Sequence, residues 1–201
     1  TGNAVTDAST LNNTLTTVTL ENAGNTTVTG LAVANVSATG QAADVTVVNA
    51  TAAHTQNYTL SGVTAGTYTD ANATTVNIVS NGTAANVLTA LSSTLATKVN
   101  LSGAAGLTFG TTTLDAAAVI DASASSGTNT VTLAAGQKYT GGTGNDIVTS
   151  AGASTVTVDA GAGTGDRLNL TGYDATKASK YVNFEILSLA SGLSVDASKI
   201  G

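Results

Sequence analysis

Short runs that alternate apolar and polar residues recur from one end of the chain to the other. A period of two is typical of β-strands that bury one face. Turn-forming Gly, Asn, Asp and Ser residues follow most runs, and about 9 to 20 residues separate one run from the next. The runs are residues 17–20, 27–29, 45–48, 58–60, 75–79, 99–101, 130–133, 155–158, 167–170 and 185–189. This irregular but persistent spacing predicts an all-β protein, built predominantly as a parallel β-solenoid with β-roll-like coils.

Two segments depart from the alternating pattern. Residues 83–98 place Leu88, Leu91 and Leu95 at helical spacing, which predicts a short amphipathic helix inserted between strands. A helical turn is also expected at residues 174–180, because an aspartate stands where it would cap the first turn.

The turns before residue 80 are looser than those after it, which divides the chain into two predicted regions. Residues 1–80 form a β region rich in Thr, Ala and Asn, for which an antiparallel β-sandwich is an alternative. Residues 81–201 form the β-solenoid, and this part contains the most regular glycine-rich turns.

Composition limits how such a chain stabilises itself. The hydrophobic fraction is 42%, yet aromatic residues make up only 3%, and Pro, Cys, Met and Trp are absent. Large interlocking side chains and disulfides are therefore excluded as the main source of stability. Thr, Val and Ile favour pleated strands, and small residues allow closely spaced turns, so coils of this chain are expected to stack.

The charge of the chain excludes some partners. The net charge is −6 and the isoelectric point is near 4.3, whereas a nucleic-acid binder needs clustered Lys and Arg. An acidic balance instead suits neutralisation by divalent cations. Every apolar run is shorter than the stretch of about 18 residues that a membrane-spanning helix needs, so no membrane span is expected.

The stretch that most clearly indicates a chemical role is residues 141–148, with the sequence Gly-Gly-Thr-Gly-Asn-Asp-Ile-Val. They follow the glycine-rich pattern G-G-x-G-x-D-x-U-x of calcium-binding β-roll turns. Tight turns direct main-chain carbonyls inward, and Asp146 adds a carboxylate. Such oxygen ligands favour Ca²⁺ over zinc or copper, so Gly142, Gly144 and Asp146 are predicted calcium ligands.

A second acidic turn follows at nearly one coil, which is ~18 residues in a β-roll. Residues 159–168 are glycine-rich, and Asp166 stands close to one coil length after Asp146. We expect Ca²⁺ between the two turns, bound by Asp146 together with Asp166 or Asp159. The alternative interpretation is an ordinary pair of turns with solvated carboxylates.

Catalytic patterns are absent from the sequence. His54 is the only histidine, and neither H-E-x-x-H nor G-x-S-x-G occurs. Asp115, Asp121, Glu185 and Asp196 could pair as glycosidase carboxylates, but the few scattered aromatic residues do not form a sugar platform. The chain is therefore predicted not to be an enzyme.

The later part of the chain resembles the RTX-type surface-layer proteins of Gram-negative bacteria. The resemblance covers about residues 70–200 and is carried by residues 119–123, 127–131, 141–148, 165–170 and 183–189. It implies calcium-dependent folding, self-assembly into an extracellular lattice on the cell surface and export by type I secretion.

The resemblance also sets the expected partners and the rival functions. Lattice neighbours, which are copies of the chain itself, are the expected partner, and a cell-surface polysaccharide is a second candidate. One alternative is the repeat region of an RTX adhesin or biofilm-matrix fibre, and another is the calcium-binding tail of a secreted hydrolase.

Overall fold

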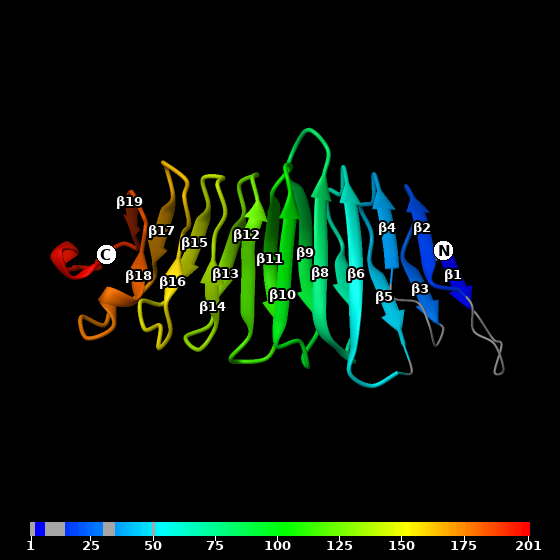
Figure 1. The fold of residues 1–201 in the computed structure, drawn as a ribbon, viewed down its shortest axis with the longest axis horizontal. Coiled ribbons are helices and arrows are strands. Elements are labelled where there is room, and N and C mark those ends of the chain that lie inside the picture. The colour runs from blue at the N-terminus through cyan, green and yellow to red at the C-terminus, as the bar shows by residue number, and fades with distance from the viewer. Residues whose placement is uncertain (1–2, 7–14, 30–34, 50) are drawn as a thin grey trace.

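A computed structural model describes residues 3–6, 15–29, 35–49 and 51–201. Two long parallel β-sheets face each other, and the chain winds between them in about eight turns (Figure 1). Strand makes up 49% of the structure and helix 3%. The predicted all-β parallel solenoid is therefore confirmed.

Successive strands alternate between the two sheets. Within the described residues, sheet A has ten strands: β1 Asn3–Thr6, β3 Thr26–Thr29, β5 Val45–Val48, β7 Thr67–Thr69, β9 Asn86–Ser92, β11 Leu107–Thr113, β13 Thr130–Leu133, β15 Ile147–Ser150, β17 Arg167–Leu170 and β19 Ile186–Leu189. Sheet B has nine in the same part of the chain: β2 Thr17–Glu21, β4 Asn35–Thr39, β6 His54–Ser61, β8 Ala73–Asn81, β10 Lys98–Gly103, β12 Val119–Ser125, β14 Lys138–Thr140, β16 Val158–Asp159 and β18 Tyr181–Val182. Two short 3₁₀ helices, η1 Ala178–Lys180 and η2 Ala197–Lys199, lie near the C-terminal end. No helix of the described chain is long and apolar enough to cross a membrane.

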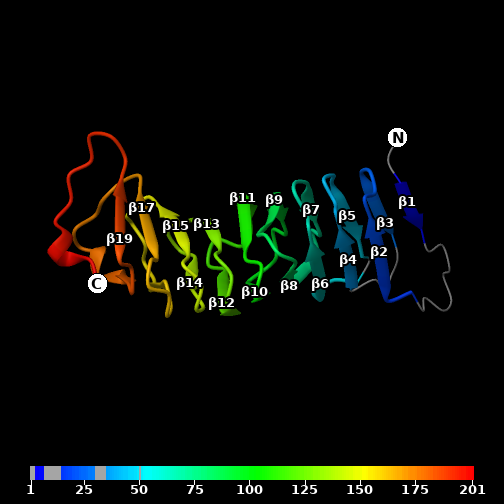
Figure 2. The same cartoon turned by 90° about the horizontal axis from the view of Figure 1, so that it is seen from above.

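Each strand pairs in parallel with the equivalent strand of the next coil. The number of residues in a coil varies. Fewer residues separate Val131 from its partner Val148 than separate Val45 from its partner Tyr68. The coils stack along the long axis of the molecule, as Figure 2 shows. The corners between strands differ in length, which accounts for the irregular spacing of the strands along the sequence, while the strands keep their parallel register.

The antiparallel sandwich considered for residues 1–80 is wrong. Strands β2, β4, β6 and β8 pair in parallel, in the same sheet as the strands that follow them. An amide ladder on the outer face of sheet B runs across residue 80. Asn57 Nδ2 donates to Asn35 Oδ1 (2.9 Å), Asn77 to Asn57 (2.7 Å) and Asn100 to Asn77 (2.7 Å). The alternating pattern alone could not decide this point, because parallel and antiparallel strands share it.

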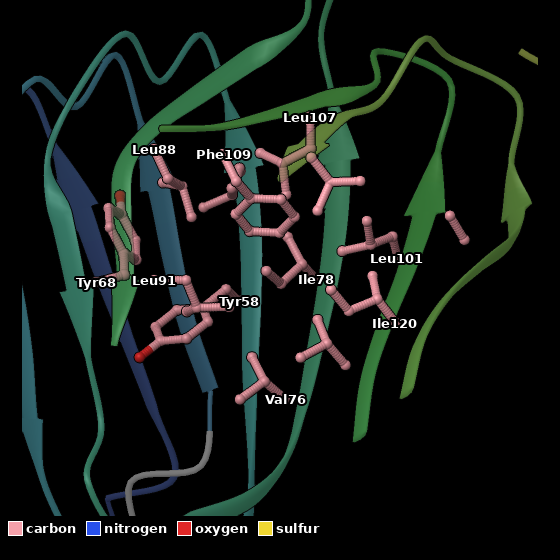
Figure 3. Close-up of a cluster of buried hydrophobic side chains, with 14 of the residues drawn as sticks. Tyr58, Tyr68, Val76, Ile78, Leu88, Leu91, Leu101, Leu107, Phe109 and Ile120 are labelled. Atoms are coloured by element: carbon pink, nitrogen blue, oxygen red, sulfur yellow. The ribbon is translucent and has the colours of Figure 1, made fainter. Parts of the chain in front are cut away.

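The core is a narrow layer of Val, Leu, Ile and Ala side chains between the two sheets. Inward residues alternate with outward ones, as in β2, where only Val18 and Leu20 are buried. The rings of Tyr58 and Tyr68 pack edge to face with centroids 5.2 Å apart, among the side chains of Figure 3. Aromatic pairs favour this geometry, and the two rings add bulk to an otherwise small-residue core.

The helix predicted over residues 83–98 is wrong, because this segment contains strand β9. Leu88 and Leu91 are three residues apart, yet both are fully buried. The cause is an extra residue in the strand: the amides of Thr89 and Ala90 both approach Gly66 O, at 2.9 and 3.5 Å. Such a β-bulge shifts the alternation by one position and imitates helical spacing. Leu95, the next residue in the supposed helical stripe, is 52% exposed.

The helical turn expected at residues 174–180 is shorter than predicted. Asp174 Oδ1 accepts hydrogen bonds from Thr176 N (2.9 Å) and Thr176 Oγ1 (2.7 Å), which forms a local turn. Helical geometry is confined to η1 at the end of the segment.

His54, the single histidine, supports a corner of the coil. Its Nδ1 lies 2.9 Å from Thr51 O, and its Nε2 lies 2.8 Å from Asp70 Oδ2. The other oxygen of Asp70 accepts the amides of Asn72 and Ala73. Both ring nitrogens are thereby engaged in holding the chain where it passes from sheet A to sheet B.

Candidate metal centre

The structure brings Asp146 and Asp166 together at the start of neighbouring strands. Asp146 immediately precedes β15 and Asp166 precedes β17, and the first residues of these strands, Ile147 and Arg167, are paired. Asn129 precedes β13 and Glu185 precedes β19 in the same way. We call Asn129, Asp146, Asp166 and Glu185 the strand-start row.

Each side chain of the strand-start row accepts a main-chain hydrogen bond from the coil before it. Asp146 Oδ1 accepts from Asn129 N (2.8 Å), Asp166 Oδ1 from Asp146 N (2.6 Å) and Glu185 Oε2 from Asp166 N (2.9 Å). Asn129 Oδ1 accepts from Leu107 N at 3.2 Å. The side chains of the row therefore supply acceptors for main-chain N–H groups of the preceding coil, close to where the strand ladders begin.

Asp146 is fully engaged by donors of the protein itself. Its Oδ1 also accepts from Asn129 Nδ2 (3.1 Å), and its Oδ2 accepts from the hydroxyl of Tyr139 (2.7 Å). Tyr139 reaches Asp146 from β14 in the opposite sheet, and both side chains have no exposed surface. Asp146 thus links two coils and two sheets, whatever else binds nearby.

Asp166 differs from Asp146 in one respect. Its Oδ1 accepts the Asp146 amide, but its Oδ2 is buried and has no hydrogen-bond partner among the described residues. The residue has no exposed surface. Buried polar atoms are nearly always satisfied by protein, water or an ion, so this oxygen marks a position for a donor or a cation.

A turn carbonyl faces the same small space as this oxygen. A Cβ atom added at Gly163 would lie 2.6 Å from Asp166 Oδ2 and 2.6 Å from Gly144 O. Both contacts are closer than real Cβ atoms show, so only glycine leaves the space beside the two oxygens free. A carboxylate oxygen and a carbonyl oxygen that border the same small space are the kind of ligands that a hard cation binds.

The remaining predicted ligands have other partners. Gly142 O accepts from Ala162 N at 2.7 Å, which joins the two glycine-rich turns. Asp159 ends β16 in sheet B, where its Oδ1 accepts from Gly161 N (3.0 Å) and Asn183 Nδ2 (2.8 Å). The structure therefore groups Gly144 and Asp166 directly and places Asp159 at the other end of the corner.

The electrostatics of the row favour a positive charge. Burial raises the pKa of Asp166, and the charges of Asp146, Glu185 and Asp159 raise it further against the hydrogen bond from the Asp146 amide. Burial also raises the pKa of Asp146, although hydrogen bonds from Tyr139, Asn129 and Gly142 oppose that effect. Without a cation, this part of the coil stack carries a charge that its surroundings penalise.

The donor set consists of oxygen atoms. Nowhere in the described chain do three or more His, Cys, Asp or Glu side chains converge as a metal-binding group. Three oxygens lie around the position of a Cβ atom on Gly163, namely both carboxylate oxygens of Asp166 and the main-chain carbonyl oxygen of Gly144. Oxygen ligands of this type suit Ca²⁺ or Mg²⁺ rather than thiolate- or imidazole-seeking metals.

Sequence reasoning missed Asn129, Tyr139 and Glu185 as parts of this centre. A signal for Asn129 was present, because residues 127–131 repeat, one coil earlier, the glycine, polar, strand order of residues 144–148. No local signal marks Tyr139, because its contact with Asp146 depends on how the two sheets face each other.

Comparisons of the chain with models of known protein families, with curated proteins and with solved structures find no match. The class is therefore defined by the molecule itself. It is a parallel β-solenoid in which two buried aspartates, Asp146 and Asp166, join neighbouring coils near the C-terminal end.

We expect Asp146→Ala to destabilise the fold even in calcium-free buffer. The change leaves the Asn129 amide and the Tyr139 hydroxyl buried without an acceptor, and each such loss costs about 1–3 kcal/mol. Urea denaturation should show a free energy of unfolding lower by about 3 kcal/mol. Asp121→Ala, on the outer face of β12, is the control and should change it little. Equal losses in the two variants would contradict the role assigned to Asp146.

The raised pKa of Asp166 predicts a sign for the pH dependence of stability. The folded state binds the proton of this carboxyl more tightly than the unfolded state, so stability rises as pH falls toward the ordinary carboxyl pKa of about 4. We expect wild type in calcium-free buffer to gain stability relative to Asp166→Asn between pH 7 and pH 4. Denaturation at a series of pH values measures the difference, and a constant difference would refute the prediction.

Proposed function

We propose that this chain is a structural segment of a calcium-dependent extracellular surface layer. In this proposal Ca²⁺ fastens neighbouring coils, and the stabilised solenoids assemble into a lattice. The observation that carries the calcium part is the buried Asp166 Oδ2, which lacks a partner among the described residues and faces the same space as Gly144 O.

The residues present fit a calcium ion in a particular division of roles. Asp166 and Gly144 would contact the ion, whereas Asp146 and Gly142 hold the two turns in position through their own hydrogen bonds. Glu185 and Asp159 add negative charge nearby. A bound Ca²⁺ would neutralise the carboxylates that burial penalises, and its binding energy would add to the stability of the folded state.

The lattice part of the proposal has separate support. The core is thin and contains few aromatic residues, so an assembly that buries further surface would add stability that a single copy lacks. The resemblance to RTX-type surface-layer proteins in residues 70–200 supports secretion, a location at the cell surface and a non-enzymatic role. Neighbouring copies would be the main partner, with a cell-surface polysaccharide as the second.

Calcium should stabilise wild type through Asp166. At a concentration of about 100 times its dissociation constant, Ca²⁺ should add about 2.7 kcal/mol to the free energy of unfolding, and chelation should lower the melting temperature. Asp166→Asn should abolish this gain, yet fold at least as well without calcium, because Asn retains the oxygen that accepts the Asp146 amide.

The matched control for calcium binding is Asp196→Asn, which alters an exposed carboxylate that forms a local turn with Ser198. Titration calorimetry and thermal melts should give wild-type calcium binding for this variant. No stabilisation of wild type by calcium, or an undiminished effect in Asp166→Asn, would refute the proposed centre.

Assembly is tested by adding Ca²⁺ to the purified chain and following light scattering and electron microscopy. We expect ordered sheets or tubes that disappear on chelation and do not form with Asp166→Asn. Calcium-stabilised particles that remain single would exclude the lattice and favour the adhesin or the hydrolase tail. Assembly that is independent of calcium would support the lattice and refute its dependence on the calcium centre.

A further inference from the structure

Sheet A is interrupted between β11 and β13. Strand β11 pairs with β9 from Leu107 to Thr113, but with β13 at one position only, Thr108 with Thr130. Strand β13 itself pairs with β15 along its whole length. The second halves of β11 and β13 are therefore neighbours that share no ladder pairs.

An extra residue explains the interruption. In β11 the inward positions are Phe109 and Thr112, because Thr112 pairs with the buried Leu91 of the bulged strand β9. In β13 the inward residues are Val131 and Leu133, only two apart. A ladder requires both strands to alternate in step, so β11 follows β9 and loses its register with β13 beyond the bulge.

A slot opens where the register is lost. It has a cavity volume of about 350 Å³ and lies between residues 110–112 of β11 and residues 132–134 at the end of β13. Pockets for small ligands begin at about this size. Main-chain groups of both strands border it without pairing with each other.

The lining of the slot is uncharged. It is bordered by Thr111, Thr112 and Thr132, together with Leu133 and Ala134. Thr111, Thr132 and Ala134 are exposed, and the Thr111 hydroxyl donates to Thr89 O at 3.5 Å. Gln137 also borders it, but its amide is held by Ala134 N (3.0 Å) and Asp115 O (3.2 Å). The lining contains no titratable side chain. A ligand of this slot is therefore expected to be neutral and to carry several hydrogen-bonding groups.

We propose that this slot binds a neutral sugar residue of a polysaccharide. The hydroxyls and the open main-chain groups would bind the hydroxyls of the sugar, and the exposed Ala134 would contact the C–H face of its ring. A peptide strand fits less well, because the part of β13 without ladder pairs, residues 131–133, is only three residues long, about 10 Å, which is short for strand pairing. The slot would serve the second partner class of the proposed function, and it does not depend on the calcium centre.

The test is a titration of ¹⁵N-labelled protein with cellotetraose and with chitotetraose, followed by NMR. We expect saturable shifts for the amides of residues 110–112 and 132–134, in calcium-free and in calcium-containing buffer alike. Thr132→Val should weaken binding about fivefold to tenfold, the effect of one lost hydrogen bond. Thr149→Val is the matched control, since Thr149 pairs with Thr132 one coil further on and lies outside the slot; it should bind like wild type.

Three results would overturn the assignment. They are the absence of saturable shifts with either oligosaccharide, an equal loss of affinity in Thr132→Val and Thr149→Val, and stronger shifts with a short extended peptide of alternating Thr and Val. The amide dispersion of each variant verifies that it is folded, and Thr111→Val replaces Thr132→Val if that chain is not. Because the readout is independent of calcium, failure of the slot and failure of the calcium centre are distinguishable.

Discussion

The structure depends on the stacking of each coil on the next in a fixed register. A chain without disulfides, Trp or Met, and with few aromatic residues, has no thick core to define its shape. Its strands are instead held by parallel ladders, and residues at or just before the strand starts add side-chain acceptors for main-chain amides. Asn86 Oδ1 accepts Val63 N (2.8 Å), Asn129 accepts Leu107 N, and Asp146 and Asp166 continue this arrangement. Because each coil touches only its neighbours, stability is close to a sum of such local terms.

Asn and Asp fill the same position in these coils with different consequences. The amide nitrogen of Asn86 donates to Ser80 Oγ (2.7 Å) and Asn81 O (2.9 Å), so the side chain is satisfied without charge. An aspartate offers a second acceptor instead, which needs a donor. Tyr139 supplies that donor to Asp146, but no described residue supplies one to Asp166. The exchange of an amide for a carboxylate therefore replaces a neutral coil contact with a buried negative charge. In the proposed function a cation would stabilise this charge, and Asp166 rather than Asp146 would be the residue that binds it.

Features that depend on local pattern could be predicted from the sequence, whereas features that depend on spatial neighbours could not. Alternation in runs such as residues 130–133 identified the strands, and the spacing of the two glycine-rich turns placed Asp146 and Asp166 on successive coils. Alternation could not show that residues 1–80 contain parallel strands, since the pattern is the same in either direction. The hydrogen bond from Tyr139 to Asp146 and the engagement of Gly142 O by Ala162 depend on distances across and between coils. The unpartnered oxygen of Asp166 could be recognised only after these contacts were known.

The false helix over residues 83–98 and the slot between β11 and β13 have one physical origin. An extra residue in β9 puts Leu88 and Leu91 on the same face, which imitates helical spacing in the sequence. Strand β11 carries a matching shift, so the pair β9–β11 keeps its ladder from end to end. Strand β13 does not, and the mismatch is transferred to the boundary between shifted and unshifted coils, where the ladder opens. A solenoid tolerates such an insertion because the disruption is confined to the two boundaries of the shifted strands, the bulge beside Gly66 and the opened ladder between β11 and β13. At the second boundary the main-chain groups of the two strands are left without ladder partners.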